Sequence, residues 1–301
     1  MDINSRKFLA TLIACSILLV GCTGESDQGA EDISAQEELE GTADIEIIPE
    51  TLEIEGSEFC DDTNQIHCML PFPSGAFLSE DSSQDTGFRL SIDGEAIPDS
   101  RSSVSDNMVI LDRLDGFSPS TQIFTAFEKV PNITGLATQF DIEKSLMDDH
   151  RSVLLNMDTG EKVFHWIEVD ARAQEGEETL LFLRTIEGLD HDTSYAVGFR
   201  GLLDSAGHQI NPHEGFRALR DNISTSSVGI EEQREHYEEM FSSLDSSGFE
   251  RASLQAAWWF HTASTDSILR DIVIMRDDAE NRLGQSGIGC NITEVTENYG
   301  N

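Results

Sequence analysis

The chain has 301 residues, with 57 aspartates and glutamates and only 19 lysines and arginines, so that the formal net charge is -38. This balance excludes a basic surface large enough to neutralise nucleic-acid phosphates or to bind anionic lipid. The sequence contains no nucleotide-binding loop, metalloprotease helix motif or nucleophile elbow. We therefore predict no nucleic-acid partner, no cofactor, no metal site and no catalytic residue.

The first 21 residues have the pattern of an export signal. Two basic residues precede an apolar run from Phe8 to Val20, which suits a signal-peptide core and is too short to span a bilayer. The run ends in Leu19-Val20-Gly21-Cys22, which resembles the lipobox of bacterial lipoproteins. That resemblance implies cleavage before Cys22 and a lipid on its thiol. The alternatives are an ordinary secretory signal with an incidental cysteine and an N-terminal membrane helix.

The residues that follow Cys22 indicate which membrane would hold the lipid anchor. Thr23 and Gly24 follow the cysteine, so the aspartate that lipoprotein families use for inner-membrane retention is absent. We therefore expect a lipid anchor at Cys22 in the outer membrane of a Gram-negative bacterium. A Gram-positive host is the alternative.

An acidic tether is predicted for residues 22–56. This segment has many carboxylates, no basic or aromatic residue and few apolar ones before Ile45. Such a composition cannot bury enough apolar surface to offset the entropy of ordering, and like charges keep the chain extended. The alternative is an acidic tail that recognises a basic partner or calcium.

Beyond residue 57 the pattern indicates strands. Phe88–Ile92 alternates and runs into Asp93-Gly94, with Glu95–Ile97 returning, which predicts a hairpin. Further predicted strands are Gln122–Phe127, Ala137–Asp141, Ser152–Met157, Val163–Val169, Thr179–Arg184 and Ser194–Arg200. Their close spacing favours antiparallel sheets over alternating strands and helices.

The last quarter predicts a helix, a strand and a second helix. The first helix carries an apolar stripe at helical spacing, formed by Ile230, Tyr237, Met240, Phe241 and Leu244, and Gly248 is placed to end it. The strand is Leu254–Thr262. Ser264 or Thr265 can cap the second helix, whose stripe is Ile268, Leu269, Ile272, Val273 and Met275. We expect both stripes to pack on the sheets or on a segment further along the chain.

Several blocks resemble the N-terminal region of bacterial virulence-factor-type extracellular lipases and related large surface lipoproteins. They are Leu70-Pro71-Phe72-Pro73-Ser74, Leu111-Asp112-Arg113-Leu114-Asp115-Gly116-Phe117-Ser118, and Trp258-Trp259-Phe260-His261-Thr262-Ala263-Ser264 with Met275-Arg276-Asp277-Asp278. Residues 121–220 are similar to bacterial Ig-like modules. The blocks there are Leu189-Asp190-His191-Asp192-Thr193-Ser194-Tyr195-Ala196-Val197 and Leu203-Asp204-Ser205-Ala206-Gly207-His208-Gln209-Ile210, in which His208 replaces the usual asparagine.

Pattern and resemblance together imply a mainly β fold. It is an Ig-like antiparallel β-sandwich with two appended amphipathic helices toward the C-terminus. The expected organisation is a lipoprotein signal peptide (1–21), an acidic tether (22–56), an N-terminal β region (57–120), an Ig-like sandwich (121–222) and a helix-strand-helix region that begins a further C-terminal domain (223–301).

The function expected from these features is that of an anchored surface lipoprotein with a non-catalytic module. Longer members of the lipase family carry a Gly-x-Ser-x-Gly elbow, which is absent here, so no catalytic residue is carried over. One alternative is the N-terminal portion of a lipase- or esterase-like hydrolase whose catalytic domain lies beyond Asn301. A second is an adhesin or carbohydrate-binding module with a cell-surface partner.

Cysteine usage indicates one disulfide. Cys15 leaves with the signal and Cys22 carries lipid, which leaves Cys60, Cys68 and Cys290 in an oxidising compartment. Cys60 and Cys68 are close enough in sequence to form a bridge, although two independent thiols are the alternative. Cys290 then has a partner beyond this chain, an intermolecular bridge or a free buried thiol.

Other candidate residues have structural interpretations that we prefer. The acidic pairs Asp61-Asp62, Asp148-Asp149, Asp190/Asp192 and Asp277-Asp278 offer calcium oxygens, but pairs are expected by chance in so acidic a chain. His165 is predicted to be half-exposed on a strand, Ser74 to be a turn residue, and at least one of Trp258 and Trp259 to lie in the core. A non-standard hydrolytic site would be sought first at Ser74, His165, His191 and His208.

Overall fold

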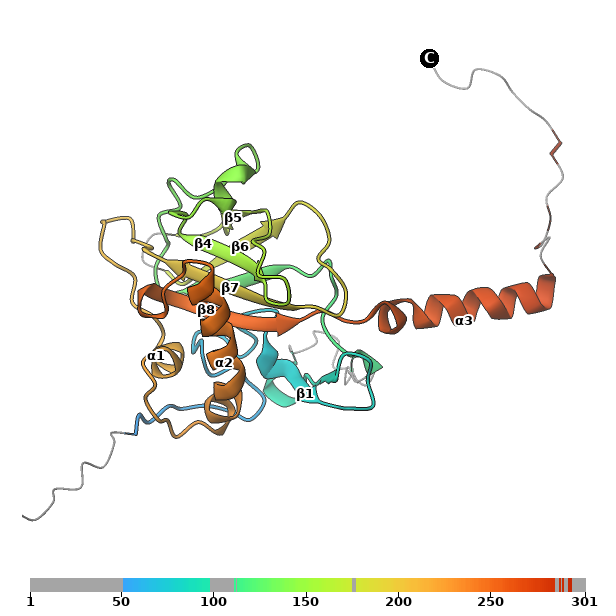
Figure 1. The fold of residues 1–301 in the computed structure, drawn as a ribbon, viewed down its shortest axis with the longest axis horizontal. Coiled ribbons are helices and arrows are strands. Elements are labelled where there is room, and N and C mark those ends of the chain that lie inside the picture. Colours follow the sequence, from blue (N-terminus) through green and yellow to red (C-terminus); the bar gives the residue numbers. More distant parts are fainter. Residues whose placement is uncertain are drawn as a thin grey trace, which may run out of the picture. The chain divides into compact units, whose positions relative to one another are not determined.

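The computed structural model describes residues 51–97, 111, 113–174, 177–284, 287, 289, 292 and 293. The predicted signal peptide, Cys22, most of the predicted tether and Cys290 lie outside these residues. The chain divides into a unit of residues 1–47 and a unit of residues 48–301, and everything described here belongs to the second. Its fold is mixed α+β, with antiparallel sheets and three α-helices in the described part (Figure 1). None of those helices is long and apolar enough to cross a bilayer.

One three-stranded sheet has the order β3-β6-β5, with β3 at Ile123–Phe127, β6 at Thr179–Thr185 and β5 at His165–Val169. All its pairings are antiparallel. Alternate residues of β6 are buried, as the period-two pattern predicts, and Leu181 and Leu183 lie on the buried face.

A second three-stranded sheet has the order β4-β7-β8, with β4 at Ser152–Asn156, β7 at Ser194–Arg200 and β8 at Leu254–His261. Every residue of β4 and β8 is buried, so this sheet is covered on both faces. The rings of Phe127 in β3 and Phe199 in β7 meet edge to face, with centroids 6.3 Å apart, and join the two sheets.

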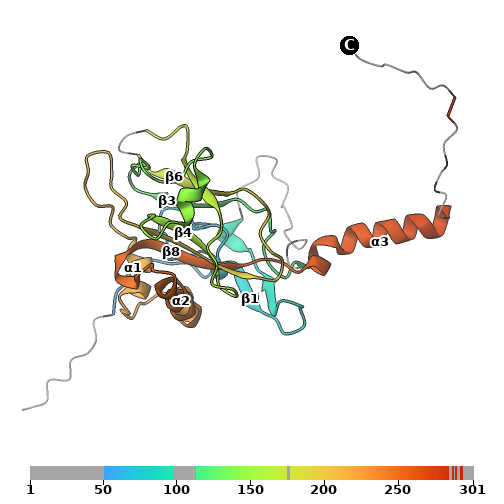
Figure 2. The ribbon, with the colours of Figure 1, turned by 45° about the horizontal axis from the view of Figure 1, so that its top comes forward.

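Helices α1 (Glu214–Arg220) and α2 (Val228–Ser246) cover the other face of the β4-β7-β8 sheet. Figure 2 shows β3 and β6 on one side of β8 and the two helices on the other. The predicted stripe of α2 is buried. Ser227 caps the helix by accepting a hydrogen bond from Ile230 N at 3.2 Å, and Gly248 follows its end with a φ of 90°.

The predicted hairpin at Asp93-Gly94 is wrong. Strand β2 (Phe88–Leu90) pairs instead with β1 (Leu78–Glu80), a short strand that the sequence pattern did not reveal. Asp93 Oδ1 accepts a hydrogen bond from Gly94 N at 2.7 Å and caps a 3-10 turn, Gly94–Ala96. The carboxylate therefore directs the chain into a turn where a return strand was expected.

The predicted strand Ala137–Asp141 is also wrong. Thr138 N donates to Asp141 Oδ1 at 2.7 Å, and this local bond forms a turn that leads into a 3-10 helix, Ile142–Leu146. The remaining predicted strands from Gln122 onward are confirmed. Helix α1 is too short to give a clear helical period and was not predicted.

Helix α3 spans Thr265–Leu283. Ser264 is its N-terminal cap, as predicted, and its Oγ accepts a hydrogen bond from Ser267 N at 3.0 Å. Ser267 is the buried residue of this helix among those described. The predicted stripe of α3 is largely exposed, including Leu269, Ile272 and Met275. The expectation that a helix stripe packs on the sheets is therefore met by α2 and not by α3.

The chain enters the fold just before the predicted end of the tether. Leu52 N donates to Ser224 O at 2.8 Å, and Ser226 N donates to Leu52 O at 3.0 Å. Ile54 is buried. Beyond it, Cys60 and Cys68 form a disulfide, with their Cα atoms 4.5 Å apart.

We expect the Cys60–Cys68 bridge to stabilise the folded chain by roughly 2 to 3 kcal/mol, the chain-entropy value for so short a loop. A non-reduced digest should give the two cysteine peptides linked. The double variant Cys60→Ser/Cys68→Ser should melt at a lower temperature, and reductant should have no further effect on it. Alkylation of both thiols before reduction would show that the bridge is absent.

Candidate functional site

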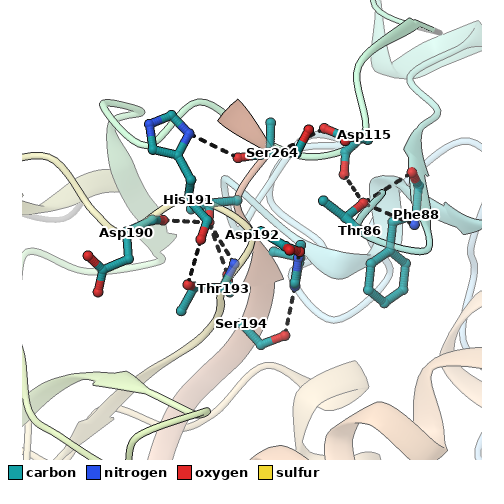
Figure 3. A network of polar contacts seen from close by, with 12 residues as sticks. Thr86, Phe88, Asp115, Asp190, His191, Asp192, Thr193, Ser194 and Ser264 are labelled. Carbon is teal, nitrogen blue, oxygen red and sulfur yellow. Dashed lines mark hydrogen bonds and ion pairs between the residues drawn. The ribbon is translucent and has the colours of Figure 1, made fainter. Parts of the chain in front are cut away.

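Ser194, His261 and Asp192 meet where β7 begins and β8 ends. Figure 3 labels Ser194 and Asp192 in this corner. Ser194 and His261 are cross-strand partners, so their side chains share one face of the sheet. Ser194 Oγ lies 2.9 Å from His261 Nδ1, and His261 Nε2 lies 3.2 Å from Asp192 Oδ1. A proton on Nε2 of His261 would satisfy both contacts, because Nε2 then donates to Asp192 and Nδ1 accepts from Ser194 Oγ.

The connectivity is that of a serine-histidine-aspartate relay, but its surroundings suit a structural role. Ser194 lies on a regular strand, and its carbonyl accepts a hydrogen bond from Met157 N at 2.8 Å. The Phe88 ring lies 5.2 Å from the His261 ring, which is nearly buried. The four surface cavities described for this chain are lined by other residues. A nucleophile needs room for its substrate and donors for an oxyanion, and neither is formed by these contacts.

The same corner joins three of the motif blocks named in the sequence analysis, which contain Asp115, Asp190 with Thr193, and Thr262 with Ser264 (Figure 3). Thr262 Oγ1 donates to Asp190 O at 2.7 Å and accepts from Thr193 N at 3.1 Å. Ser264 N donates to Asp115 Oδ1 at 3.0 Å, and Asp115 O accepts from Thr86 Oγ1 at 2.5 Å. These bonds fix the start of α3 against two distant segments.

Gly116 is required by a close approach in this corner. A Cβ at this position would lie 2.7 Å from Ala263 N, closer than such contacts allow. Phe117 N donates to His261 O at 2.9 Å, and Ala263 N donates to Phe117 O at 2.8 Å, so the two backbones pair directly. The Asp115-Gly116-Phe117 motif therefore has a structural explanation.

A second cluster, formed by His150, Ser152 and His165, is buried between the sheets. Ser152 Oγ lies 2.9 Å from His165 Nε2, and His165 Nδ1 lies 2.8 Å from Val163 O. His150 Nε2 accepts from Ala137 N at 2.9 Å. His165 has no exposed surface, so the prediction that it is half-exposed is wrong. Burial lowers the pKa of His150, and it lowers that of His165 to about 4.

Ser74 is confirmed as a turn residue. Its Oγ accepts from Ala76 N at 3.2 Å at the start of a 3-10 turn and donates to Asp61 Oδ2. Asp61 is almost fully buried, and burial raises its pKa to about 6 against the opposing effect of hydrogen bonds from Ser74 and Thr63. Asp61 therefore holds the disulfide loop to the core.

The remaining predicted residues lie apart from one another in the described part of the chain. Among the described residues, no three histidine, cysteine or acidic side chains are grouped to hold a metal ion. His191 Nδ1 lies 3.2 Å from Ala263 O, and His208 is 77% exposed in its side chain. Trp258 and Trp259 are both buried, which exceeds the prediction that at least one is in the core.

Two surface cavities are the largest described. One, of about 490 Å³, lies beside the disulfide loop and the start of α2, and carboxylates of Glu58, Glu80, Asp93 and Glu232 line it. The other, of about 410 Å³, is apolar and lies on the outer face of β3 and β6, against the loop from Ile66 to Phe72. Sequence reasoning missed both, because their residues come from separate segments and show no common motif.

The buried His165 makes stability depend on pH. Its folded pKa of about 4 lies below the ordinary 6.5, so the unfolded chain takes up the proton first as the pH falls. Its contribution is complete above pH 6.5 and is lost as the pH falls toward 4, by an amount on the order of 3 kcal/mol. Asp61 acts in the opposite direction, because its raised pKa favours the fold below pH 3.8 and this gain is lost as the pH rises through about 6.

We expect His165→Gln, which keeps an acceptor for Ser152 Oγ, to flatten the loss of stability between pH 6.5 and 4.5. Denaturant unfolding across this range measures the effect. Parallel curves for the wild-type chain and His165→Gln would show that His165 does not control this acid sensitivity.

Comparisons with protein families, with curated proteins and with solved structures find no match to this chain.

Proposed function

We propose that this chain is a bacterial surface lipoprotein, anchored in the outer membrane through Cys22, that presents a non-catalytic, Ig-like β-sandwich module. The proposal rests on Leu19-Val20-Gly21-Cys22 after the apolar run. Twenty-nine residues separate Cys22 from Leu52, where the described fold begins. An acidic coil of that length gives the module a reach of roughly 30 Å from the membrane.

The non-catalytic part of the proposal is supported by how the polar residues are used. Ser194, His261 and Asp192 have the connectivity of a hydrolase, but Ser194 and His261 are paired across two regular strands and the Phe88 ring lies 5.2 Å from the His261 ring. The histidines at 150 and 165 are buried and satisfied by neighbouring groups. Since Trp258 and Trp259 are buried, they offer no platform for a sugar, which disfavours a carbohydrate-binding module built on them.

A second candidate is the N-terminal portion of a lipase- or esterase-like hydrolase with a downstream catalytic domain. The exposed apolar face of α3 favours it, because such a domain would cover that face. In this alternative the module described here positions the enzyme at the membrane and performs no chemistry itself.

We expect Cys22→Ser to release the protein from the membrane fraction or to leave its signal uncut, because serine offers no thiol for lipid attachment. Detergent partitioning and the mass of the mature N-terminus measure this. Cys15→Ser, inside the apolar run, is the matched control and should behave as wild type. If Cys22→Ser is processed and partitions normally, the anchor lies elsewhere.

We expect the purified chain to hydrolyse short and long acyl nitrophenyl esters no faster than buffer, because none of the four described cavities is lined by Ser194. Ser194→Ala should show the same rate and lose about 1 kcal/mol of stability, the usual value for one hydrogen bond. Saturable hydrolysis that disappears in Ser194→Ala would instead establish the Ser194–His261–Asp192 group as an active site.

A further inference from the structure

Helix α3 carries an exposed apolar seam. Ile268, Ile272, Met275 and Ala279 are spaced by four, three and four residues, which is the spacing of the buried positions of a coiled coil. The side chain of Ile272 lies at the centre of this seam and is among the most exposed isoleucines of the chain, at 61%. Leu269 and Leu283 flank the seam on one side and are also exposed.

The charges beside the seam are arranged asymmetrically. Asp271 and Asp278 occupy one flank, and Arg276 occupies the other between Leu269 and Leu283. In a parallel pair of helices, a residue on the first flank faces the residue five positions later on the partner's second flank. This places Asp271 of each copy opposite Arg276 of the other. An antiparallel pair would instead bring the aspartate flanks together.

We propose that the α3 seam binds a second copy of this chain as a parallel two-helix coiled coil. The two Asp271–Arg276 pairs make the seam self-complementary, as a two-fold interface requires. Their present partners do not prevent this exchange. Asp271 is paired with Arg113 at 3.1 Å and Arg276 with Asp277 at 2.7 Å, and these exposed ion pairs contribute little.

The association is weak and depends on concentration. The seam spans fewer than three heptads, and each copy carries a net charge of -38, which opposes the approach of two chains. Attachment of both copies to one membrane would raise their local concentration. The effect of membrane attachment rests on the proposed function, whereas the proposal that two α3 helices pair does not.

The test is disulfide cross-linking of the full chain in its host cells, in a Cys290→Ser background. Ile272→Cys places one thiol opposite its counterpart in a parallel pair, so mild oxidation should give a covalent homodimer on a non-reducing gel. Ile274→Cys is the matched control, because Ile274 is equally exposed, at 58%, and lies on the opposite side of the helix. It should remain monomeric.

Charge reversal tests the orientation. In the Ile272→Cys chain, Asp271→Arg alone or Arg276→Asp alone should lower the yield of dimer about tenfold, because each turns two attractions into repulsions. Co-expression of the two reversed chains should restore the yield as a heterodimer. Both sites are exposed, so the melting temperature should not change.

The following outcomes would overturn the proposal. They are equal cross-linking at positions 272 and 274, absence of a homodimer at either position, and yields insensitive to charge reversal. Cross-linking of position 272 to a different polypeptide would also overturn it and would favour a separate partner for α3. Cys22→Ser tests the anchoring proposal separately. If that variant is released from the membrane fraction as expected, the anchoring proposal stands whatever the cross-linking shows, so the two proposals fail independently.

Discussion

The burial of β8 on both faces is the constraint on which the rest of the fold depends. All eight residues from Leu254 to His261 are buried, with the helices on one side of the strand and the β3-β6-β5 sheet on the other. Gln255 bonds to Leu202 and Ile210 and so fixes a distant loop. Trp259 donates to Gln233 of α2 at 3.0 Å. A strand near the end of the described chain thus holds segments that precede it by as many as 171 residues, as the contact of the Phe88 and Trp259 rings shows.

Local periodicity predicted the elements that obey it. The sequence predicted the apolar stripe of α2 and the alternation of β6, because burial on one face imposes a period on the residues. It also predicted the cap at Ser264, because serine is a preferred residue at a helix N-terminus. The hairpin at Asp93-Gly94 failed because the turn signal is the same whether a strand or a 3-10 turn follows. The pairing of β1 with β2 and the short helix α1 depend on tertiary contacts that leave no local period.

The candidate site was beyond sequence reasoning for a different reason. Ser194 and His261 are 67 residues apart, and only strand pairing brings them together. The motif blocks around them were visible, and their structural explanation emerges from contacts such as that of Gly116 with Ala263. The side chains of Asp115 and Thr262 make their hydrogen bonds to the backbone of segments that are distant in sequence. Residue types alone cannot distinguish such a structural junction from a reactive site.

The Cys60–Cys68 bridge has a mechanical consequence for a chain held at its amino end. A pull transmitted through the residues before Leu52 is carried first by the hydrogen bonds to Ser224 and Ser226. If these bonds break, and with them the bonds from Ile54 N to Ser226 Oγ and from Ser57 N to Asp62 Oδ1, the force reaches Cys60. It then passes through the cross-link to Cys68, so that the backbone of residues 61–67 carries none of it. Asp61 and its neighbours in that loop are thereby shielded from tension, and the cross-link serves as a stop that limits how far the module can be unravelled.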